Sequence, residues 1–304
     1  MRRRTLKRRG FSLIELLIAS ALLMVVTGTA FSLLIAFQKH YTSTAIKADM
    51  HAGVRNATEL LEQEIGQAGL LSLTPTSLSA AVTGGAAAQT VPIASIAGMF
   101  VGEKVQIDLG TAEETVAITA IASSPTTITG IFENSHSAGA VVSATGVFPQ
   151  GILSGSTATQ LNMFGDINAD GSLVFVQYNC DTVAGTLTRS ITPIAAGAKN
   201  TAVILLENLR PNPGGTACFQ YPATTSVTVS GSGTTYNFIP GVAVTLTTQT
   251  AELDPNTRQY ATETKAFLDV APRNVQEGIT LATNGIDDFL QPNPPGNCLL
   301  LGTC

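Results

Sequence analysis

The sequence predicts an α+β protein in which one long N-terminal helix packs on a C-terminal antiparallel β-sheet, with a small β insert. An apolar run over residues 11–37 continues at helical spacing to about residue 70. From residue 71 onward, short β-branched stretches are separated by Gly, Pro and Asn, which is typical of strands and turns. No other segment of similar length repeats the helical period, so a sheet is expected to cover part of the helix.

The composition limits the classes of function. The chain has 304 residues, of which 44% are hydrophobic and 12% are charged, enough for one large or two modest domains rather than a disordered chain. Its net charge of −5 argues against non-specific nucleic-acid binding, which needs a basic surface. We therefore expect no nucleic-acid partner.

The basic residues are concentrated in a leader over residues 1–10. Six of the 16 Lys and Arg residues lie there, and no acid does. Residues 11–37 follow with Glu15 as their single charge, and about 20 apolar residues are enough to cross a bilayer. The basic flank predicts a cytoplasmic N-terminus and an exported remainder. A cleaved secretory signal would have a shorter apolar core and a small-residue cleavage site beyond it.

Residues 38–68 contain no proline and place Val54, Leu61 and Ile65 on one face. They extend the apolar run into one helix of roughly 55 residues, or ~80 Å. Gly66 and Gly69 mark its expected end. Only residues 11–37 can lie in lipid, so the later half of the helix must lie on a soluble domain.

Glu15 stands near the start of the apolar run, where an unpaired carboxylate costs a few kcal/mol. Either it reaches the headgroups, or it meets a positive charge of a partner inside an assembly.

The string from Arg8 to Leu16 resembles the type IV prepilin signature: a basic leader ending in Gly10, then Phe11, then Glu15, then an apolar helix. The resemblance implies that a prepilin peptidase cleaves between Gly10 and Phe11 and methylates the new amine of Phe11. It also implies that Glu15 pairs with the N-terminal amine of a neighbouring subunit, since opposite charges in a dry bundle offset each other's desolvation. The fold it implies is pilin-like.

The domain organisation follows from these boundaries. We expect a leader at 1–10, the long helix at 11–70, an exported β-rich body at 71–275 and an irregular tail at 276–304. Small-residue stretches flank residues 91–145, which read as a β insert subdomain. Expected strands are Lys104–Leu109, Glu114–Ala120, Thr126–Phe132, Leu173–Asn179, Thr186–Ser190, Val242–Thr248 and Glu263–Val270, while Thr201–Asn208 is either a strand or a helical turn.

A second resemblance lies in the body. Residues 173–190 are similar to a hairpin of the larger minor pilins of the PilW and J types, in which a strand ending near a Tyr leads through a polar turn to a Leu-x-Arg strand. Tyr178 and Arg189 match that pattern. Residues 271–274 are similar to the close of PilW-type subunits.

Asp166, Asn168 and Asp170, followed by Gly171, fit the first half of a calcium loop. The twelfth position is Gln177, which cannot supply the bidentate carboxylate. The alternative is a polar hairpin turn in which Asp-Gly supplies the positive φ. Apart from this possible Ca²⁺ site, no cofactor is expected.

All four cysteines lie in the region expected to be exported, where disulfides form. Three pairings are open. Sequence order favours Cys180–Cys218 and Cys298–Cys304. Zinc is disfavoured because no C-x-x-C pair occurs.

No catalytic motif stands out. His40 and His51 lie ~16 Å apart along the expected helix, too far to share one metal, and His136 stands alone in a turn. The neighbouring acids at 113–114 and 287–288 are expected to be solvated. We predict that the chain is not an enzyme.

The resemblance implies a PilW-type minor pilin with a role in pilus assembly, adhesion or motility. It would be held in the inner membrane as a single-pass protein with a cytoplasmic N-terminus. It would then be built into a periplasmic or extracellular pilus. Its partners would be the prepilin peptidase, other major and minor pilins and the inner-membrane assembly platform. The alternatives are a J-type pseudopilin of type II secretion, and an adhesin or binding module displayed by a filament or anchored in the membrane.

Overall fold

The computed structural model of the protein describes residues 11–194 and 196–294. The chain divides into two compact units. In the described part, the first unit comprises residues 11–51 and the loop Thr250–Ala261, and the second comprises the rest. Helix α1 (Leu13–Gln67) is 55 residues long and belongs to both, which agrees with the expected single helix.

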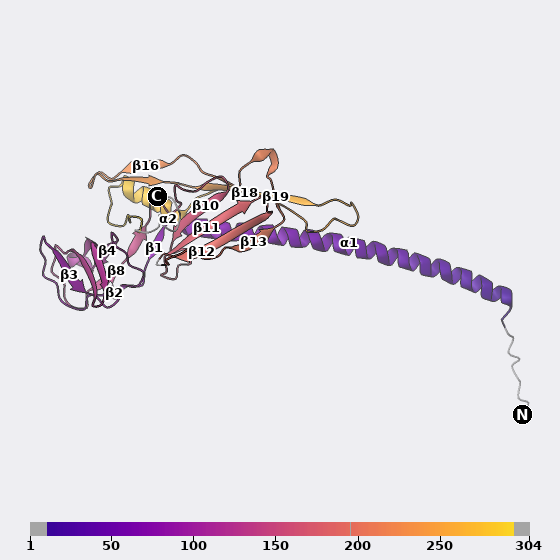
Figure 1. The fold of residues 1–304 in the computed structure, drawn as a ribbon, viewed down its shortest axis with the longest axis horizontal. Coiled ribbons are helices and arrows are strands. Elements are labelled where there is room, and N and C mark those ends of the chain that lie inside the picture. The colour runs from indigo at the N-terminus through magenta and orange to yellow at the C-terminus, as the bar shows by residue number, and fades with distance from the viewer. Residues whose placement is uncertain (1–10, 195, 295–304) are drawn as a thin grey trace, which may run out of the picture. The chain divides into compact units, whose positions relative to one another are not determined.

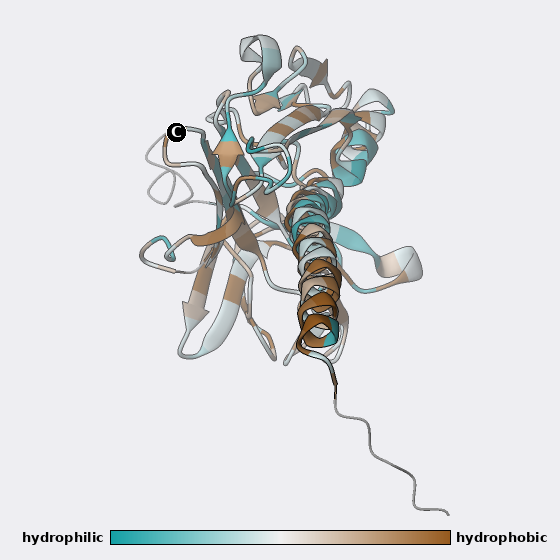
Figure 2. Cartoon of the chain, turned by 90° about the vertical axis from the view of Figure 1, so that its right-hand side faces the viewer, coloured by the Kyte–Doolittle hydropathy of each residue, from teal (hydrophilic) through white to brown (hydrophobic). Residues whose placement is uncertain are grey.

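The part of α1 in the first unit is apolar around its whole circumference at its N-terminal end. Figure 2 shows this as brown turns that give way to paler and teal turns further along the helix. All residues from 11 to 42 are exposed. Four hydroxyl groups in this stretch bond to helix carbonyls three or four residues back, which satisfies them without water; they belong to Ser20, Thr27, Thr29 and Ser32.

Two of the antiparallel sheets in the second unit share a buried core with α1 (Figure 1). One sheet has the order β10-β11-β12-β13, and its strands are β10 (Gln160–Gly165), β11 (Val174–Asp181), β12 (Thr186–Pro193) and β13 (Val203–Glu207). The other has the order β14-β18-β15, with β19 also paired to β18; its strands are β14 (Leu209–Arg210), β15 (Phe219–Gln220), β18 (Val242–Gln249) and β19 (Thr262–Val270). Residues of α1 from Val54 to Ile65 pack with both sheets in one buried cluster.

A β unit precedes these sheets in the chain. One of its sheets has the order β2-β8-β4-β5, formed by β2 (Thr76–Ser77), β8 (Val141–Ser143), β4 (Lys104–Ile107) and β5 (Glu114–Ala117). The other has the order β3-β7-β6, formed by β3 (Ala88–Pro92), β7 (Thr126–Ile131) and β6 (Ala120–Ser123). A short 3-10 turn, Gly110–Ala112, joins β4 to β5.

The chain changes sheets between β5 and β6, so the single strand expected at 114–120 is two strands. The N–H of Ile118 bonds to the carbonyl of Glu103 beside β4, whereas the N–H of the next residue, Thr119, bonds to Thr129 on β7. These two adjacent amides therefore bond to acceptors in two different sheets. This corner lets Val116 and Ile118 share one core with Ile128.

The remaining elements include those of a third buried cluster. Strands β16 (Thr225–Thr228) and β17 (Thr235–Phe238) make a hairpin, β1 (Leu70–Ser72) pairs with β9 (Thr145–Val147), and helix α2 runs over Arg273–Thr283. A second 3-10 turn lies at Pro213–Gly215. Val275 and Ala282 of α2 are buried with Phe238 and Leu290.

Helix α2 corrects the expectation of an irregular tail from residue 276. The apolar residues of α2 fall on one face at helical spacing, and that face closes over Phe238. The ambiguous segment Thr201–Asn208 contains a strand, β13. The α+β class, the long helix and the mostly antiparallel sheets are as the sequence predicts.

Among the described residues of the β unit, Glu103 has a fully buried carboxyl group whose pKa is strongly raised. Its Oε2 accepts the N–H of Phe100 at 3.2 Å, and its Oε1 is buried with no hydrogen-bond partner among the described residues. Burial raises the pKa of this carboxyl to about 8. The folded chain therefore holds a proton at neutral pH that the unfolded chain releases.

The first prediction concerns this carboxyl. Because its folded pKa lies above its unfolded value near 4.5, its contribution to the free energy of unfolding falls as pH rises from about 4.5 to about 8. At ~1.4 kcal/mol per pH unit, the loss is on the order of 5 kcal/mol. Glu103→Gln should abolish this slope, so that variant and wild type diverge as pH rises. Urea unfolding in detergent between pH 5 and 8.5 measures it; parallel pH profiles would contradict the prediction.

Candidate functional site

Glu15 caps the N-terminus of α1. Its Oε2 accepts the backbone N–H of Ser12 at 3.0 Å, and the Ser12 carbonyl accepts the N–H of Leu16 at 3.1 Å. This is the glutamate half of a capping box, which places negative charge at the positive end of the helix dipole. Phe11 lies just before the helix and is 88% exposed. Gly10 lies outside the described residues.

The apolar surface of α1 is uncovered through residue 42. Helix α1 is long and apolar enough to cross a membrane, and none of its most apolar 18-residue window is buried. A helix that is apolar on all sides and exposed on all sides is stable only when lipid or other proteins cover it.

A buried ion pair docks the later half of α1 on the sheet. Glu64 is 4% exposed, and its carboxylate receives Nε of Arg189 at 3.1 Å, a second bond from the Arg189 guanidinium and a bond from the Tyr178 hydroxyl. Tyr178 and Arg189 face each other across the β11–β12 hairpin. Burial, and then the charge of Glu64, raise the pKa of Tyr178, so the hydroxyl stays protonated and donates.

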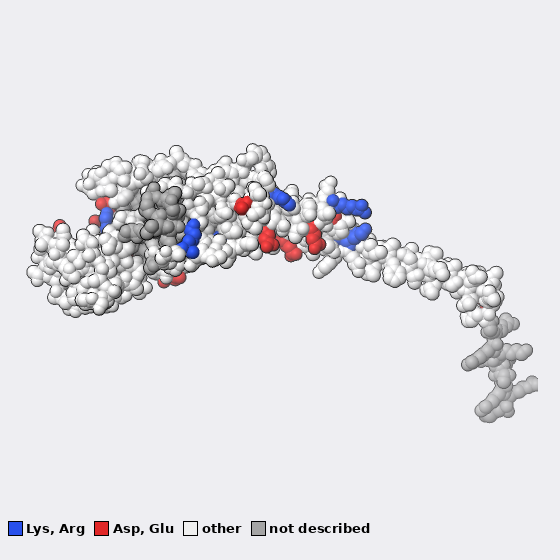
Figure 3. All heavy atoms as spheres, in the orientation of Figure 1, with Lys and Arg blue, Asp and Glu red and all other residues white. Residues whose placement is uncertain are grey.

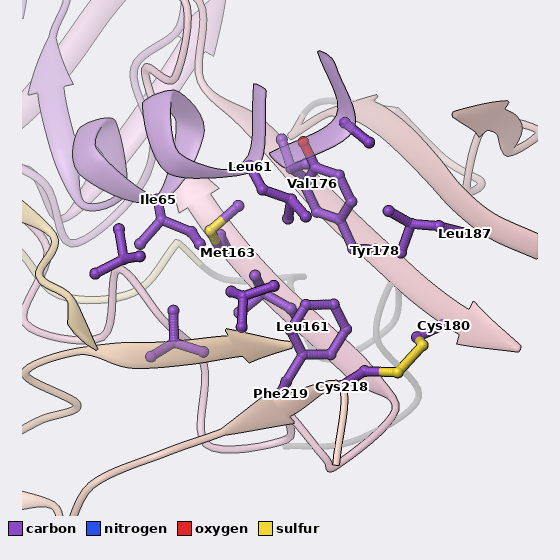
Figure 4. Close-up of a cluster of buried hydrophobic side chains, with 14 of the residues drawn as sticks. Leu61, Ile65, Leu161, Met163, Val176, Tyr178, Cys180, Leu187, Cys218 and Phe219 are labelled. Carbon is purple, nitrogen blue, oxygen red and sulfur yellow. A yellow bond between two sulfur atoms is a disulfide. The ribbon is translucent and has the colours of Figure 1, made fainter. Parts of the chain in front are cut away.

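Apolar side chains surround this ion pair. Leu61 and Ile65 of α1 lie over Met163, Val176 and Leu187 of the sheet (Figure 4). Glu64 lies within the buried face of α1, at helical spacing from Ala57 and Leu61. A charged residue inside an apolar stripe was the signal that could have revealed the pair.

Cys180 and Cys218 form a disulfide in the same cluster (Figure 4). It ties β11 to the segment that enters β15, and both cysteines are buried. Cys298 and Cys304 lie outside the described residues.

The Asp166–Asp170 segment forms a tight turn. Oδ1 and Oδ2 of Asp166 accept the N–H groups of Asp170 and Gly171 at 2.9 and 3.0 Å. Oδ1 of Asp170 accepts the N–H of Ser172, and Asn168 is exposed. These hydrogen bonds are those expected of a polar turn, which is the alternative to a calcium loop at this segment. In the described part of the chain, no group of three or more His, Cys, Asp or Glu side chains is arranged to hold a metal ion.

His136 is buried between two carboxylates, an arrangement that sequence reasoning missed. Its Nδ1 lies 3.3 Å from Oδ2 of Asp108 and its Nε2 lies 2.6 Å from Oε1 of Glu114. The second oxygen of Glu114 accepts the N–H groups of Glu133 and Asn134. The two acids bind opposite edges of the ring, so this cluster joins β4, β5 and the loop after β7 rather than converging on a ligand. His40 and His51 lie on α1, apart from it.

Comparison with known proteins adds one finding. A family model described as the prokaryotic N-terminal methylation motif matches residues 5–31. No curated protein and no solved structure matches the chain. The motif supports a type IV pilin-like or pseudopilin-type prepilin and indicates a structural subunit rather than an enzyme. It implies processing by a prepilin peptidase, membrane anchoring through the apolar helix, and then assembly with other pilins.

The second prediction tests the buried ion pair. Glu64→Ala leaves the Arg189 guanidinium buried without its counter-charge and should lower the free energy of unfolding by roughly 3–5 kcal/mol. The matched control is Glu59→Ala on the same helix, whose exposed pair with Arg55 should be worth less than about 0.5 kcal/mol. Urea unfolding of both variants in detergent measures the difference. Equal losses would show that Glu64 does not anchor the helix.

The third prediction concerns the disulfide. Its cysteines are 38 residues apart, and closing a loop of that length stabilises the folded state by about 4 kcal/mol in the chain-entropy description. Replacing both with serine should lower the unfolding free energy by roughly 2–5 kcal/mol. A reductant should destabilise the wild type similarly and affect the double variant much less. A wild type insensitive to reductant under unfolding conditions would refute the stabilising role.

Proposed function

We propose that the chain is a PilW-type minor pilin of a type IV pilus. Residues 1–10 would be the leader, the prepilin peptidase would cleave between Gly10 and Phe11, and Phe11 would be N-methylated. The observation that carries the proposal is the uncovered apolar helix that begins at Leu13, within the residues that the methylation motif matches. Such a surface needs lipid before assembly and other subunits after it.

The body supports the PilW-type assignment. The two residues that carry the hairpin resemblance, Tyr178 and Arg189, are the two that bind Glu64 of α1. The residues of the hairpin resemblance therefore hold the helix on the sheet, which is a role that the architecture of such a subunit requires.

Glu15 has the role of an assembly residue in this proposal. Its carboxylate lies in the first turn, beside Phe11, and would accept the methylated amine of a neighbouring subunit in the dry filament core. Opposite charges there offset each other's desolvation cost. A subunit lacking this carboxylate would still be processed but would enter the fibre poorly.

The fourth prediction separates processing from assembly. With a prepilin peptidase, intact mass should show a chain that begins at N-methylated Phe11, and Gly10→Val should block that cleavage. Glu15→Gln should leave cleavage intact and reduce the subunit in sheared filaments by about tenfold or more, because an unpaired amine is costly in the core. The control is Glu59→Gln, an exposed helix acid expected to change neither readout.

Two results would overturn the proposal. A chain that keeps Met1 in the presence of the peptidase would make residues 11–37 an ordinary signal anchor. A processed chain absent from sheared pili, whose deletion abolishes protein secretion, would instead make it a J-type pseudopilin.

A further inference from the structure

The loop Thr250–Ala261, between β18 and β19, is fastened to α1. Asp254 is 1% exposed, and its Oδ2 accepts the Ser43 hydroxyl and lies against Nζ of Lys47, each at 2.7 Å. The bonds from Lys47, from the N–H of Asn256 and from Ser43 lower the pKa of Asp254, so it is ionised throughout the physiological range. The loop and this stretch of helix belong to one compact unit.

The loop also has internal order. The N–H of Thr250 bonds to the Ala261 carbonyl at 2.8 Å, the N–H of Asp254 to Gln259 at 2.9 Å, and the N–H of Arg258 to the Asp254 carbonyl at 2.7 Å. Leu253 and Tyr260 nevertheless remain 50% and 48% exposed. Two large apolar side chains that stay exposed on an ordered loop indicate a surface that interacts with a partner or a membrane.

The helix fixes where this surface lies relative to a bilayer. If Glu15 lies at the cytoplasmic headgroups, the apolar stretch from Leu16 to Phe37 spans ~33 Å, close to the ~30 Å hydrocarbon thickness. Ser43, where the loop attaches, then lies ~9 Å beyond Phe37 and less if the helix tilts, which is headgroup depth.

The residues at this level are those found at membrane interfaces. Lys39 and Tyr41 follow Phe37 directly and are exposed, and Arg258 is exposed on the loop. Figure 3 shows blue basic side chains directly beyond the N-terminal stretch of α1, in which Glu15 is the single charged residue. Aromatic and basic side chains together favour a bilayer surface.

We propose that the Thr250–Ala261 loop is a second membrane contact of the anchored subunit, with Leu253 and Tyr260 at the headgroup–acyl boundary and Arg258 facing phospholipid phosphates. The proposal rests on the membrane anchoring of the proposed function. The Asp254 attachment would then fix how far α1 sinks into the bilayer, because loop and helix meet the membrane together.

The chain contains no tryptophan, so a single introduced indole reports on its own position. The full chain would be reconstituted into phosphatidylethanolamine–phosphatidylglycerol vesicles carrying a spin-label quencher on the headgroup or mid-chain. Leu253→Trp is the test variant. Val183→Trp, at a 97% exposed turn of the body, is the aqueous control, and Phe31→Trp marks the apolar helix.

We expect the headgroup quencher to lower the emission of Leu253→Trp at least roughly two-fold more than that of Val183→Trp, as an interfacial position requires. Adding Asp254→Ala, which detaches the loop, should remove most of that difference. Circular dichroism of each variant checks that it is folded.

Equal quenching of Leu253→Trp and Val183→Trp, with Phe31→Trp quenched by the mid-chain label, would overturn the proposal and leave the anchoring intact. Loss of quenching in Phe31→Trp as well would overturn both. A blue shift of Leu253→Trp that grows with the protein-to-lipid ratio and resists both quenchers would show a second protein chain on the loop, and would also overturn the lipid contact.

Discussion

The burial of one carboxylate, that of Glu64, governs how the long helix and the sheet fit together in the second unit. Apolar contacts along α1 could be made at more than one rotation or axial position, since they are not directional. The carboxylate has only one partner site, between Tyr178 and Arg189 on facing strands of one hairpin. Any slip would bury an unpaired charge at a cost of several kcal/mol. The pair therefore fixes the register of the helix.

The same unbroken helix carries two different surfaces. Beyond residue 52, the buried apolar residues of α1 lie along one face of the helix, and this face packs into a core shared with both sheets. Before residue 43, apolar residues cover every face and none is buried. The chain can therefore fold its body completely while half of α1 remains unsatisfied. That half supplies the driving force for membrane insertion and, after processing, for packing against other subunits.

Features carried by period and composition could be predicted from the sequence: the 55-residue helix, most long strands and the α+β class. Features set by tertiary contacts could not. Strands β5 and β6 are adjacent in sequence and read as one, because the change of sheet at Ile118 depends on distant acceptors. His136 looked isolated because Asp108 and Glu114 approach it only after the sheets close. Among the site residues, the motif around Phe11 and Glu15 is local and readable, whereas Glu64 needed its partners to be recognised.

The core of the β unit limits how freely a binding module in this unit could move. Its buried residues are continuous with aromatic side chains of the body: Phe148 packs against Phe164 with 4.3 Å between ring centroids, and both belong to the cluster that contains Val105 and Ile128. Polar bonds reinforce the junction, since the Gln291 side chain bonds to both the N–H and the carbonyl of Lys104. A unit that shares its core with the body cannot swing freely on a linker, because opening that junction would expose the shared apolar surface. Any ligand surface on it would be presented rigidly by the body rather than by a tethered domain.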